Sequence, residues 1–516
     1  MIETLKGYYS SRPIVFILAL AFVVRLIAAI FSQGYAMHDD HFLIIESSSS
    51  WAADNDYNNW LPSTQQKLVD AGYKDELKPE GHSFVYPGVH YLLFEAMNAI
   101  GFENPKYQMF VIRLLHAFLG LWTVWLSMRL TRYLSDEKNI ILVGWAAALG
   151  WAFAFLSVRN LVEIVCVPFL LQALLYFFKS KKEHLLRFAI LSGVFIAITI
   201  AIRYQLFIYF GVFGLVLIIQ GNWKTAIWIL TGFIFGFGLL QGVLDFVIWG
   251  YPFAEMIEYF AYNMSDARFD YAEDLTRTYG LNYIVILMII TLPIAGIFWF
   301  FGFFVQWRKN IILVVPTLAF LVVHMIYVNT QERFIFPMIP MFLILGIIGW
   351  NSFRQSSVFW RNKHRLWSRL LQVSWGINIV LLIFSSTYYG KKSRVESAYL
   401  LYENSTYNFA ILENTVDGYE PMIPKFYSGN WDFTFLQVGV GEDYAKFHDL
   451  LKDESFLVYF YGENNLEGRL AHVTREFGEL EYVNRFKSSF VDRIIQWINP
   501  VNRNDVIVVF SRKRMK

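Results

Sequence analysis

Long apolar runs separated by short polar connections dominate the chain. A helix that crosses a bilayer needs about 20 mostly apolar residues. About eleven segments meet this requirement, and two of them are divided only by Arg203 and its polar neighbours. The pattern predicts an all-α polytopic membrane protein with spans at 13–33, 108–130, 139–157, 161–178, 186–202, 204–220, 224–249, 282–305, 311–329, 334–351 and 367–388.

The first apolar run, 14–31, has two interpretations. It follows Lys6 and Arg12, as the apolar part of a signal peptide would, but Arg25 interrupts it and no clear small-residue cleavage pattern follows. Its length, about 18 residues, is enough to span a bilayer. We therefore interpret it as a retained first helix that enters the membrane from the cytoplasm.

Lysine and arginine are concentrated in alternate connections, as expected for cytoplasmic loops. With a cytoplasmic N-terminus, the inside connections hold the basic clusters at 132–138, 179–187, 224, 308–309 and 352–369. The outside connections hold few basic residues. An odd number of spans then places the C-terminus outside.

Two long segments fall on the outside in this topology. The first, 34–107, is polar and aromatic, and we expect it to form interfacial helices, one of them over the broken apolar stretch 84–100. The second, 389–516, is richer in charge, with predicted strands at 455–461 and 506–511 and a predicted helix at 442–452. We predict a membrane domain over 1–388 and a small extracytoplasmic α/β domain over 389–516.

The composition agrees with a membrane protein and excludes some kinds of partner and site. The chain has 516 residues, of which 56% are hydrophobic and 17% charged, whereas soluble domains average about 25% charged. A net charge of +2 gives no reason to expect a nucleic-acid partner. The single cysteine, Cys166, excludes an internal disulfide and a cysteine-based zinc site, and we interpret it as a small buried hydrophobic residue.

The first polar motif follows the first span and contains His38, Asp39, Asp40 and His41. A carboxylate at the membrane surface can act as a general base toward a substrate hydroxyl, and the flanking histidines allow a metal site instead. A hydrated start of a loop is the structural alternative. At the other end of the same loop, His82 lies in the polar stretch 80–87, for which a turn leading into an interfacial helix is the simpler interpretation.

Arginines mark two predicted outside turns. One turn carries Arg159 and Asn160 with Glu163 close behind, and the other carries Arg203. A guanidinium group suits phosphate oxygens, whereas snorkelling toward lipid headgroups is an equally good explanation for an arginine at the edge of a membrane.

Two further stretches lie at predicted outside ends of spans. Asp245 lies near the end of one span, followed by Asn263, and a carboxylate in a membrane helix is costly unless it has a role or already lies at the interface. Glu332 and Arg333 follow another span and either pair with each other or bind and orient a phosphate. All of these stretches fall on one face of a topology drawn without reference to them, which favours one extracytoplasmic active site.

In order and composition these stretches resemble the motifs of the family 22 glycosyltransferases of the GT-C class, which include the dolichol-pathway and GPI-anchor mannosyltransferases. Residues 38–42 look like the first-loop "P-D-E-x-F" motif, and 81–87 look like "R-S-x-x-x-P". Residues 159–163 are similar to "R-x-x-S-N-x-x-E", and Arg203 matches the arginine after the next span. Asp245 to Gly250, Asn263 and Tyr279-Gly280 look like "D-x-x-x-Y-G … N … Y-G", and 330–337 resemble "H-K-E-x-R-F-x-F-P".

The sequence also departs from that pattern. Asp40 stands where the family usually has glutamate, and Gln331 and Thr330 replace the usual lysine and histidine. His82 stands where arginine is common. A substrate pocket that differs from that of the eukaryotic enzymes is therefore expected, and 389–516 has no match in the pattern.

The resemblance implies a GT-C fold and inverting transfer of a sugar, typically mannose, from a polyprenyl-phosphate sugar to a glycan or lipid-linked glycan acceptor, without a metal or other cofactor. It implies Asp39 or Asp40 as base, with Asp39 slightly preferred. Donor phosphate binding is assigned to Arg203, Arg333 and Arg159, and substrate binding to His38, His41, His82, Asn160, Glu163, Asp245, Asn263 and Glu332.

Two other functions remain open from the residues alone. A lipid-linked glycan transporter would also carry polar residues in membrane helices, although transporters place them near the midplane and often in repeats. A metal-dependent oligosaccharyl or phosphoglycan transferase would use the histidines and aspartates of 38–41. Compact loops favour a bacterial cell membrane, with the endoplasmic reticulum and a lumenal site as the alternative.

Overall fold

The computed structural model describes residues 11–265, 280–327, 330–404, 406–414, 422–439, 442–499 and 503–512. The chain divides into two compact units. Unit 1 contains Met1–Ile30, Asn59–Val89 and Ile112–Thr387, and unit 2 contains Phe31–Asn58, His90–Val111 and Tyr388–Lys516. The division passes through two continuous helices, α6 (Val85–Ala99) and α7 (Pro105–Leu134).

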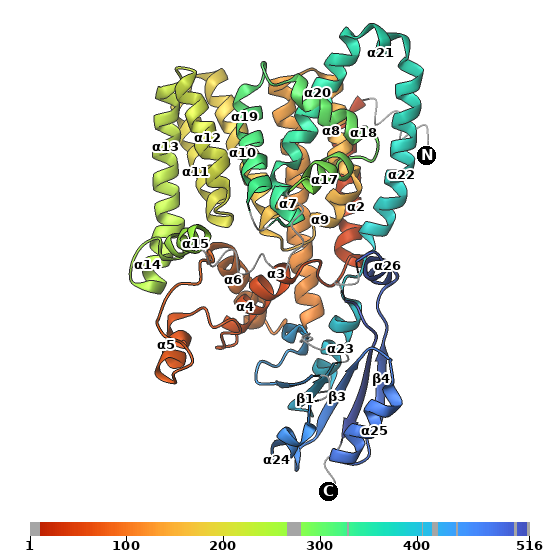
Figure 1. Cartoon of the computed structure of the whole chain (residues 1–516). Coiled ribbons are helices and arrows are strands. Elements are labelled where there is room, and N and C mark those ends of the chain that lie inside the picture. The colour runs from red at the N-terminus through yellow and green to blue at the C-terminus, as the bar shows by residue number, and fades with distance from the viewer. Residues whose placement is uncertain are drawn as a thin grey trace. The chain divides into compact units, whose positions relative to one another are not determined.

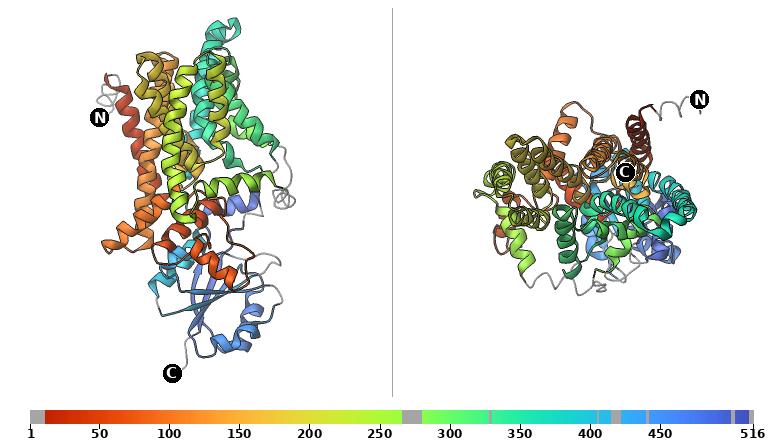
Figure 2. Two further views of the ribbon diagram at one scale, coloured as in Figure 1. Left: turned by 90° about the vertical axis from the view of Figure 1, so that its left-hand side faces the viewer. Right: turned by 90° about the horizontal axis from the view of Figure 1, so that it is seen from above.

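Unit 1 is a bundle of apolar helices (Figure 1 and Figure 2). Besides α7, its elements are α2 (Pro13–Phe31), α5 (Pro62–Asp70), α8 (Glu137–Leu149), α9 (Trp151–Leu156), α10 (Val162–Glu183), α11 (Leu186–Ile202), α12 (Leu206–Ile219), α13 (Trp223–Phe237), the π-helix η2 (Gly238–Gly242), α14 (Val243–Trp249), α15 (Ala254–Met264), α17 (Asn282–Ile290), α18 (Ala295–Val305), α19 (Ile311–Ile326), the 3-10 helix η3 (Glu332–Met338), α20 (Ile339–Ser356), α21 (Val358–Asn362) and α22 (His364–Ser386).

Each apolar segment predicted from the sequence is helical, but several are shorter or more broken than a regular span. Six helices within the described residues are long and apolar enough to cross a membrane: Pro13–Phe31, Pro105–Leu134, Val162–Glu183, Trp223–Trp249, Glu332–Ser356 and His364–Ser386. A seventh is added if the bent pair α17 and α18 counts as one span. The helices α11, α12 and α19 are apolar but shorter. The count of eleven spans and the interfacial position of the first-loop helices stay predictions.

The bend between α17 and α18 measures 109°. Pro293 precedes the bend, and the backbone of Ile294 has a φ of +65°, which a β-branched residue rarely adopts. The Ala295 amide donates to the Pro293 carbonyl at 2.7 Å, closing a three-residue γ-turn. Beyond the bend α18 packs closely on α20, where a methyl group added to Gly349 would lie 1.8 Å from the Gly302 carbonyl oxygen. Glycines thus permit this backbone contact.

Arg25, the residue that interrupts the first apolar run, is buried in α2. Its Nη1 and Nη2 atoms donate to the carbonyls of Ala148 and Ala147, each at 3.0 Å, at the C-terminal end of α8. A cation there complements the helix dipole and satisfies carbonyls that have no partner within the helix. From α22, the Asn378 amide donates to the Leu149 carbonyl at 2.8 Å.

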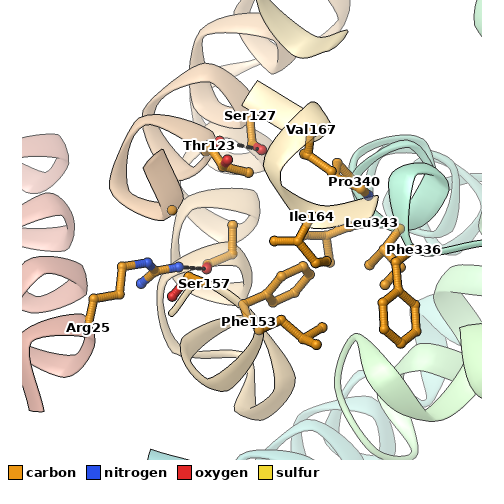
Figure 3. A pocket seen from close by; sticks show the side chains of 14 residues that line it. Arg25, Thr123, Ser127, Phe153, Ser157, Ile164, Val167, Phe336, Pro340 and Leu343 are labelled. Carbon is orange, nitrogen blue, oxygen red and sulfur yellow. Dashed lines mark hydrogen bonds between the residues drawn. The ribbon is translucent and has the colours of Figure 1, made fainter. Parts of the chain in front are cut away.

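The break between α8 and α9 is therefore held by side chains from other helices. Arg25, Thr123, Ser127 and Ser157 line one side of an internal cavity there, and apolar residues such as Phe153 and Phe336 line the other (Figure 3). The connection that follows α9 carries Arg159 and Asn160 and leads into α10. The break thus positions a stretch that the sequence marks as functional.

Unit 2 contains a five-stranded mixed sheet with the order β2-β1-β3-β5-β4. The strands β2, β1 and β3 are parallel, and β5 is antiparallel to both β3 and β4. Besides most of α6, its elements are α3 (His38–His41), the π-helix η1 (Phe42–Glu46), α4 (Ser47–Trp51), α23 (Lys392–Glu403), β1 (Phe409–Glu413), η4 (Lys425–Ser428), β2 (Thr434–Val438), η5 (Tyr444–Phe447), α24 (His448–Leu451), β3 (Phe456–Tyr461), α25 (Leu466–Phe477), β4 (Glu481–Phe486), α26 (Phe490–Ile498) and β5 (Ile507–Arg512).

The strands predicted at 455–461 and 506–511 are confirmed as β3 and β5, whose side chains are almost entirely buried. The helix predicted over 442–452 is present in two short pieces, because a 3-10 helix, η5, precedes the four-residue α-helix α24. The Asp443 carboxylate accepts the Ala445 amide two residues on, at 2.8 Å, which favours the tighter turn. The proposed domain limits at 388 and 389 stay a prediction.

Candidate active site

Three charged side chains that are distant in sequence converge in unit 1. Glu163 lies in the first turn of α10, where an acidic group is favoured by the helix dipole. Arg203 lies at the break between α11 and α12, and its Nη2 is 3.1 Å from Glu163 Oε1. Arg333, in η3, places Nε 3.5 Å from the same carboxylate oxygen and also donates to Gln331 Oε1 at 2.9 Å.

This group, the Glu163 cluster, consists of Glu163, Arg203 and Arg333, and in the described part of the chain its two cations approach the same carboxylate. Glu163 is fully buried, and the side chains of Arg203 and Arg333 are 16% and 9% exposed. The Phe334 ring lies 5.1 Å from Arg203 Cζ and 5.8 Å from Arg333 Cζ. Buried charge is stable when it is balanced. Two guanidinium groups that meet at one carboxylate oxygen therefore form an environment that suits an anionic ligand. A guanidinium group is well shaped for phosphate oxygens.

The other arginine of the predicted set is also inside the protein. Arg159 is 2% exposed and its guanidinium lies 4.6 Å from the Phe155 ring centre, and the neighbouring Asn160 is buried as well. Burial of Arg159 and Arg333 within the bundle does not fit side chains that snorkel to lipid headgroups. Glu332 is exposed, and the carboxylate that Arg333 approaches is that of Glu163.

A second group joins the predicted residues Asp245 and His82. The Asp245 carboxylate accepts the Gln241 side-chain amide at 2.8 Å and the Glu255 backbone amide at 3.1 Å. The Glu255 carboxylate accepts the His82 backbone amide at 2.9 Å and the Trp249 indole at 2.8 Å. Asp245 and Glu255 thus hold the stretch 81–83 against α14 and α15. A substrate-binding role for Asp245 and His82 stays a prediction.

Glu255 is a buried carboxyl group at the start of α15, outside the long apolar helices. Burial raises its pKa to about 7, helped by the nearby Asp245 charge, although the hydrogen bonds from His82 and Trp249 act in the opposite direction. Between the ordinary value near 4.5 and about 7, the folded protein therefore binds more protons than the unfolded chain. The free energy of unfolding must fall as pH rises through this window.

We expect Glu255→Gln to flatten this pH dependence. Thermal unfolding of the detergent-solubilised protein should show a melting temperature that falls between pH 5 and pH 8 in the parent and changes much less in the variant, with a free-energy difference of about 2–3 kcal/mol across the window. Glu258→Gln, one helical turn along the same helix near Lys78, is the charge-matched control and should keep the parental slope. An unchanged slope in Glu255→Gln would contradict the assignment.

Asn263 lies at the end of α15. Its Oδ1 accepts the Tyr327 hydroxyl at 2.5 Å, and its Nδ2 donates to the Tyr259 carbonyl at 2.7 Å. These bonds tie α15 to the end of α19. Tyr279, which belongs to the same sequence motif, lies outside the described residues.

The first-loop aspartates lie in unit 2 and differ sharply in environment. Asp40 is 3% exposed, and its two oxygens accept the backbone amides of Ala36 and Met37, each at 3.1 Å. The Asp39 side chain is 41% exposed and lies 3.6 Å from His38 Nδ1. Asp40 therefore has a defined structural task at the start of α3, whereas Asp39 presents a carboxylate to solvent.

His41 is part of a buried arrangement rather than an open site. Its ring stacks between those of Tyr35 and Tyr427, and its Nε2 is 2.9 Å from Glu46 Oε1. Both oxygens of Glu46 accept the Phe426 backbone amide, at 3.0 and 2.9 Å. Glu46 was missed in the sequence, although an isolated acidic residue in the apolar stretch 42–46 was a usable signal.

The alternative of a metal site at 38–41 gains no geometric support. Among the residues described, no group of three or more histidine, cysteine, aspartate or glutamate side chains is arranged to hold a metal ion. Asp40 and His41 turn inward to the amides and the carboxylate named above.

The order of the motifs agrees with a match over most of the sequence. The model of the Alg9-like mannosyltransferase family matches residues 14–406. The chain belongs to this family. It is therefore a glycosyltransferase, and its apolar helices make it an integral membrane protein. No curated protein sequence matches the chain.

Solved structures of GT-C enzymes share the fold of this Alg9-like protein. ArnT from Cupriavidus metallidurans bound to undecaprenyl phosphate is 12% identical, with a TM-score of 0.59 over 96% of this chain and 97% of that chain. The apo state of the same enzyme is 13% identical, with a TM-score of 0.58 over 97% of this chain and 98% of that chain. The Archaeoglobus fulgidus oligosaccharyltransferase in complex with Zn and sulfate is 11% identical, with a TM-score of 0.52 over 92% of this chain and 72% of that chain. At these identities the likeness concerns the fold alone.

Proposed function

We propose that this Alg9-like glycosyltransferase transfers a sugar, most simply mannose, from a polyprenyl-phosphate donor to a hydroxyl of a glycan or lipid-linked glycan on the extracytoplasmic side of a bacterial cell membrane. The observation that carries the proposal is the Glu163 cluster, in which Arg203 and Arg333 share one buried carboxylate. A phosphodiester-linked sugar lipid carries an anion that two converging guanidinium groups can bind. The solved ArnT complex of the same fold contains undecaprenyl phosphate, a lipid of this class.

In the proposed reaction the Asp39 carboxylate removes the proton of the acceptor hydroxyl. The acceptor oxygen forms a bond to the anomeric carbon as the bond from that carbon to the phosphate oxygen breaks. In-line displacement inverts the anomeric configuration. The leaving lipid phosphate gains negative charge, which Arg203 and Arg333 stabilise, so no acid is needed to protonate it.

The direct test is incubation of the purified protein with radiolabelled polyprenyl-phosphate mannose and a panel of lipid-linked glycan acceptors. We expect label to move to an acceptor, with the opposite anomeric configuration, and activity to persist in excess chelator. Transfer that stops with chelator would favour the metal-dependent alternative. Movement of an intact lipid-linked glycan across vesicles, without transfer, would favour a transporter.

A further inference from the structure

The short helix α26 carries an apolar face that the sheet of unit 2 does not cover. Phe490, Ile494, Trp497 and Ile498 are 58%, 40%, 83% and 70% exposed. They lie at positions i, i+4, i+7 and i+8, which form one side of a helix. Exposed residues in such a contiguous set, including a tryptophan, differ from the scattered apolar residues of an ordinary protein surface.

The opposite side of α26 is fixed by Asp492, which is fully buried. Its Oδ1 accepts the Tyr388 hydroxyl at 2.8 Å and the Lys391 amide at 3.1 Å, and its Oδ2 accepts the Lys392 amide at 3.2 Å. The Ser489 hydroxyl accepts the Asp492 amide and caps the helix. The direction of the apolar face is thus set by bonds on the polar side.

The segment that Asp492 holds comes directly after the membrane helix α22, which ends at Ser386. Tyr388 follows that end by two residues and Lys392 by six. At no more than about 3.6 Å per residue, the chain allows Tyr388 at most about 7 Å and Lys392 about 22 Å from the end of the helix. The polar layer on each side of a bilayer is several ångströms thick, which is comparable with the limit for Tyr388. The Tyr388 bond therefore holds one point of α26 close to this layer.

The chain leaving the first membrane helix is tied to the same segment. The Ser32 hydroxyl donates to the Tyr388 carbonyl at 3.1 Å, and the Gly390 amide donates to the Gln33 carbonyl at 3.0 Å. Residues 32 and 33 directly follow α2, which ends at Phe31. Two membrane exits therefore limit how far the α26 anchor can move from the bilayer.

A cation borders the apolar face. Arg493 is exposed, and its Cζ lies 6.0 Å from the centre of the Phe490 ring. Lys487, three residues before Phe490 in the chain, is exposed as well. Basic groups beside an apolar helix face contact headgroup phosphates while the apolar groups enter the acyl boundary. Tryptophan is enriched at this depth.

We propose that α26 is an interfacial membrane helix that inserts Phe490, Ile494, Trp497 and Ile498 into the bilayer surface and anchors the C-terminal sheet to the lipid. The partner is the phospholipid bilayer itself, with Lys487 and Arg493 at the phosphate level. This contact sets the height of the sheet above the membrane independently of what the enzyme transfers.

The test uses the full chain reconstituted in vesicles of phosphatidylcholine and phosphatidylglycerol. With Cys166 replaced by alanine, single cysteines are introduced by Trp497→Cys and Ile498→Cys and labelled with a nitroxide. We expect the labels to collide several-fold more often with oxygen, and several-fold less often with a water-soluble nickel chelate, than a label at Tyr482→Cys. Tyr482 is the matched control because it is 61% exposed on β4 of the same unit.

Both labelled positions are at the surface, so the folded state should persist, and each variant is checked by its melting temperature. Chelate access equal to that of the Tyr482 label at both positions would overturn the proposal. Protection from both oxygen and chelate would also overturn it, because that result means a protein surface, such as a second copy, covers the face.

Discussion

Asp39→Asn is expected to abolish sugar transfer while leaving the protein as stable as the parent. A positioned general base contributes about 10²–10⁴-fold to a rate, so the turnover number should fall by at least about 100-fold. The Asp39 side chain is 41% exposed, so we expect its replacement by an isosteric amide to remove the charge at little cost in stability. Single-turnover transfer from labelled donor lipid, combined with thermal unfolding, measures both effects.

Asp40→Asn is the matched control for this experiment. Because the Asp40 carboxylate accepts two backbone amides at the start of α3, replacing one of its oxygens by an amide donor costs about 1–3 kcal/mol. We expect a lowered melting temperature, with any loss of activity following the loss of structure. Full activity in Asp39→Asn would reject Asp39 as base. A stable but inactive Asp40→Asn would transfer the role to Asp40.

The helical segments were predictable because a run of about 20 apolar residues has few other stable structures in a membrane. The breaks within these helices could not be predicted from the sequence. The break after α8 depends on Arg25 and Asn378, which approach it from helices more than 100 residues away in each direction. In the C-terminal segment, β3 and β5 are apolar and buried, whereas β4 is mostly exposed and lacks the alternation that would reveal it.

The candidate site was predictable as a set of residues and not as a set of contacts. The sequence suggested Glu332 as a partner of Arg333, since neighbours in sequence are the natural first guess. Long-range packing instead brings Arg333 to Glu163, 170 residues away. Glu255 was missed because its importance shows only when folding buries it beside an amide from another segment. Glu46 did carry a signal, as an isolated acidic residue in an apolar stretch, but its distant partner Phe426 could not be predicted.

The Glu163 cluster yields the second large prediction. Glu163→Gln removes the buried carboxylate that Arg203 and Arg333 approach, and loss of one partner from a buried ion pair costs about 3–5 kcal/mol. We therefore expect the unliganded variant to melt well below the parent. If the cluster binds the lipid phosphate, polyprenyl phosphate should raise the melting temperature of Glu163→Gln by more than it raises that of the parent, because the phosphate replaces the missing negative charge.

Arg333→Ala should give the opposite pattern. Glu163 keeps Arg203 as its counterion, so the unliganded protein loses less stability, but the response to polyprenyl phosphate should shrink and the Michaelis constant for the donor should rise by about 10–100-fold, as expected for a lost charged hydrogen bond. Arg333→Lys should restore only part of the response to polyprenyl phosphate and of the donor affinity, because lysine lacks the planar, two-pronged guanidinium group. Arg308→Ala, which removes an exposed arginine between α18 and α19, should change neither quantity.

The two variants together separate a binding site from a structural ion pair. A purely structural cluster would make both Glu163→Gln and Arg333→Ala less stable and leave their response to polyprenyl phosphate equal to that of the parent. A phosphate site predicts opposite changes relative to the parent. The rise in melting temperature with polyprenyl phosphate should be larger in Glu163→Gln and smaller in Arg333→Ala. Equal responses would therefore remove the arginines from the donor site, and with them the observation on which the proposed reaction rests.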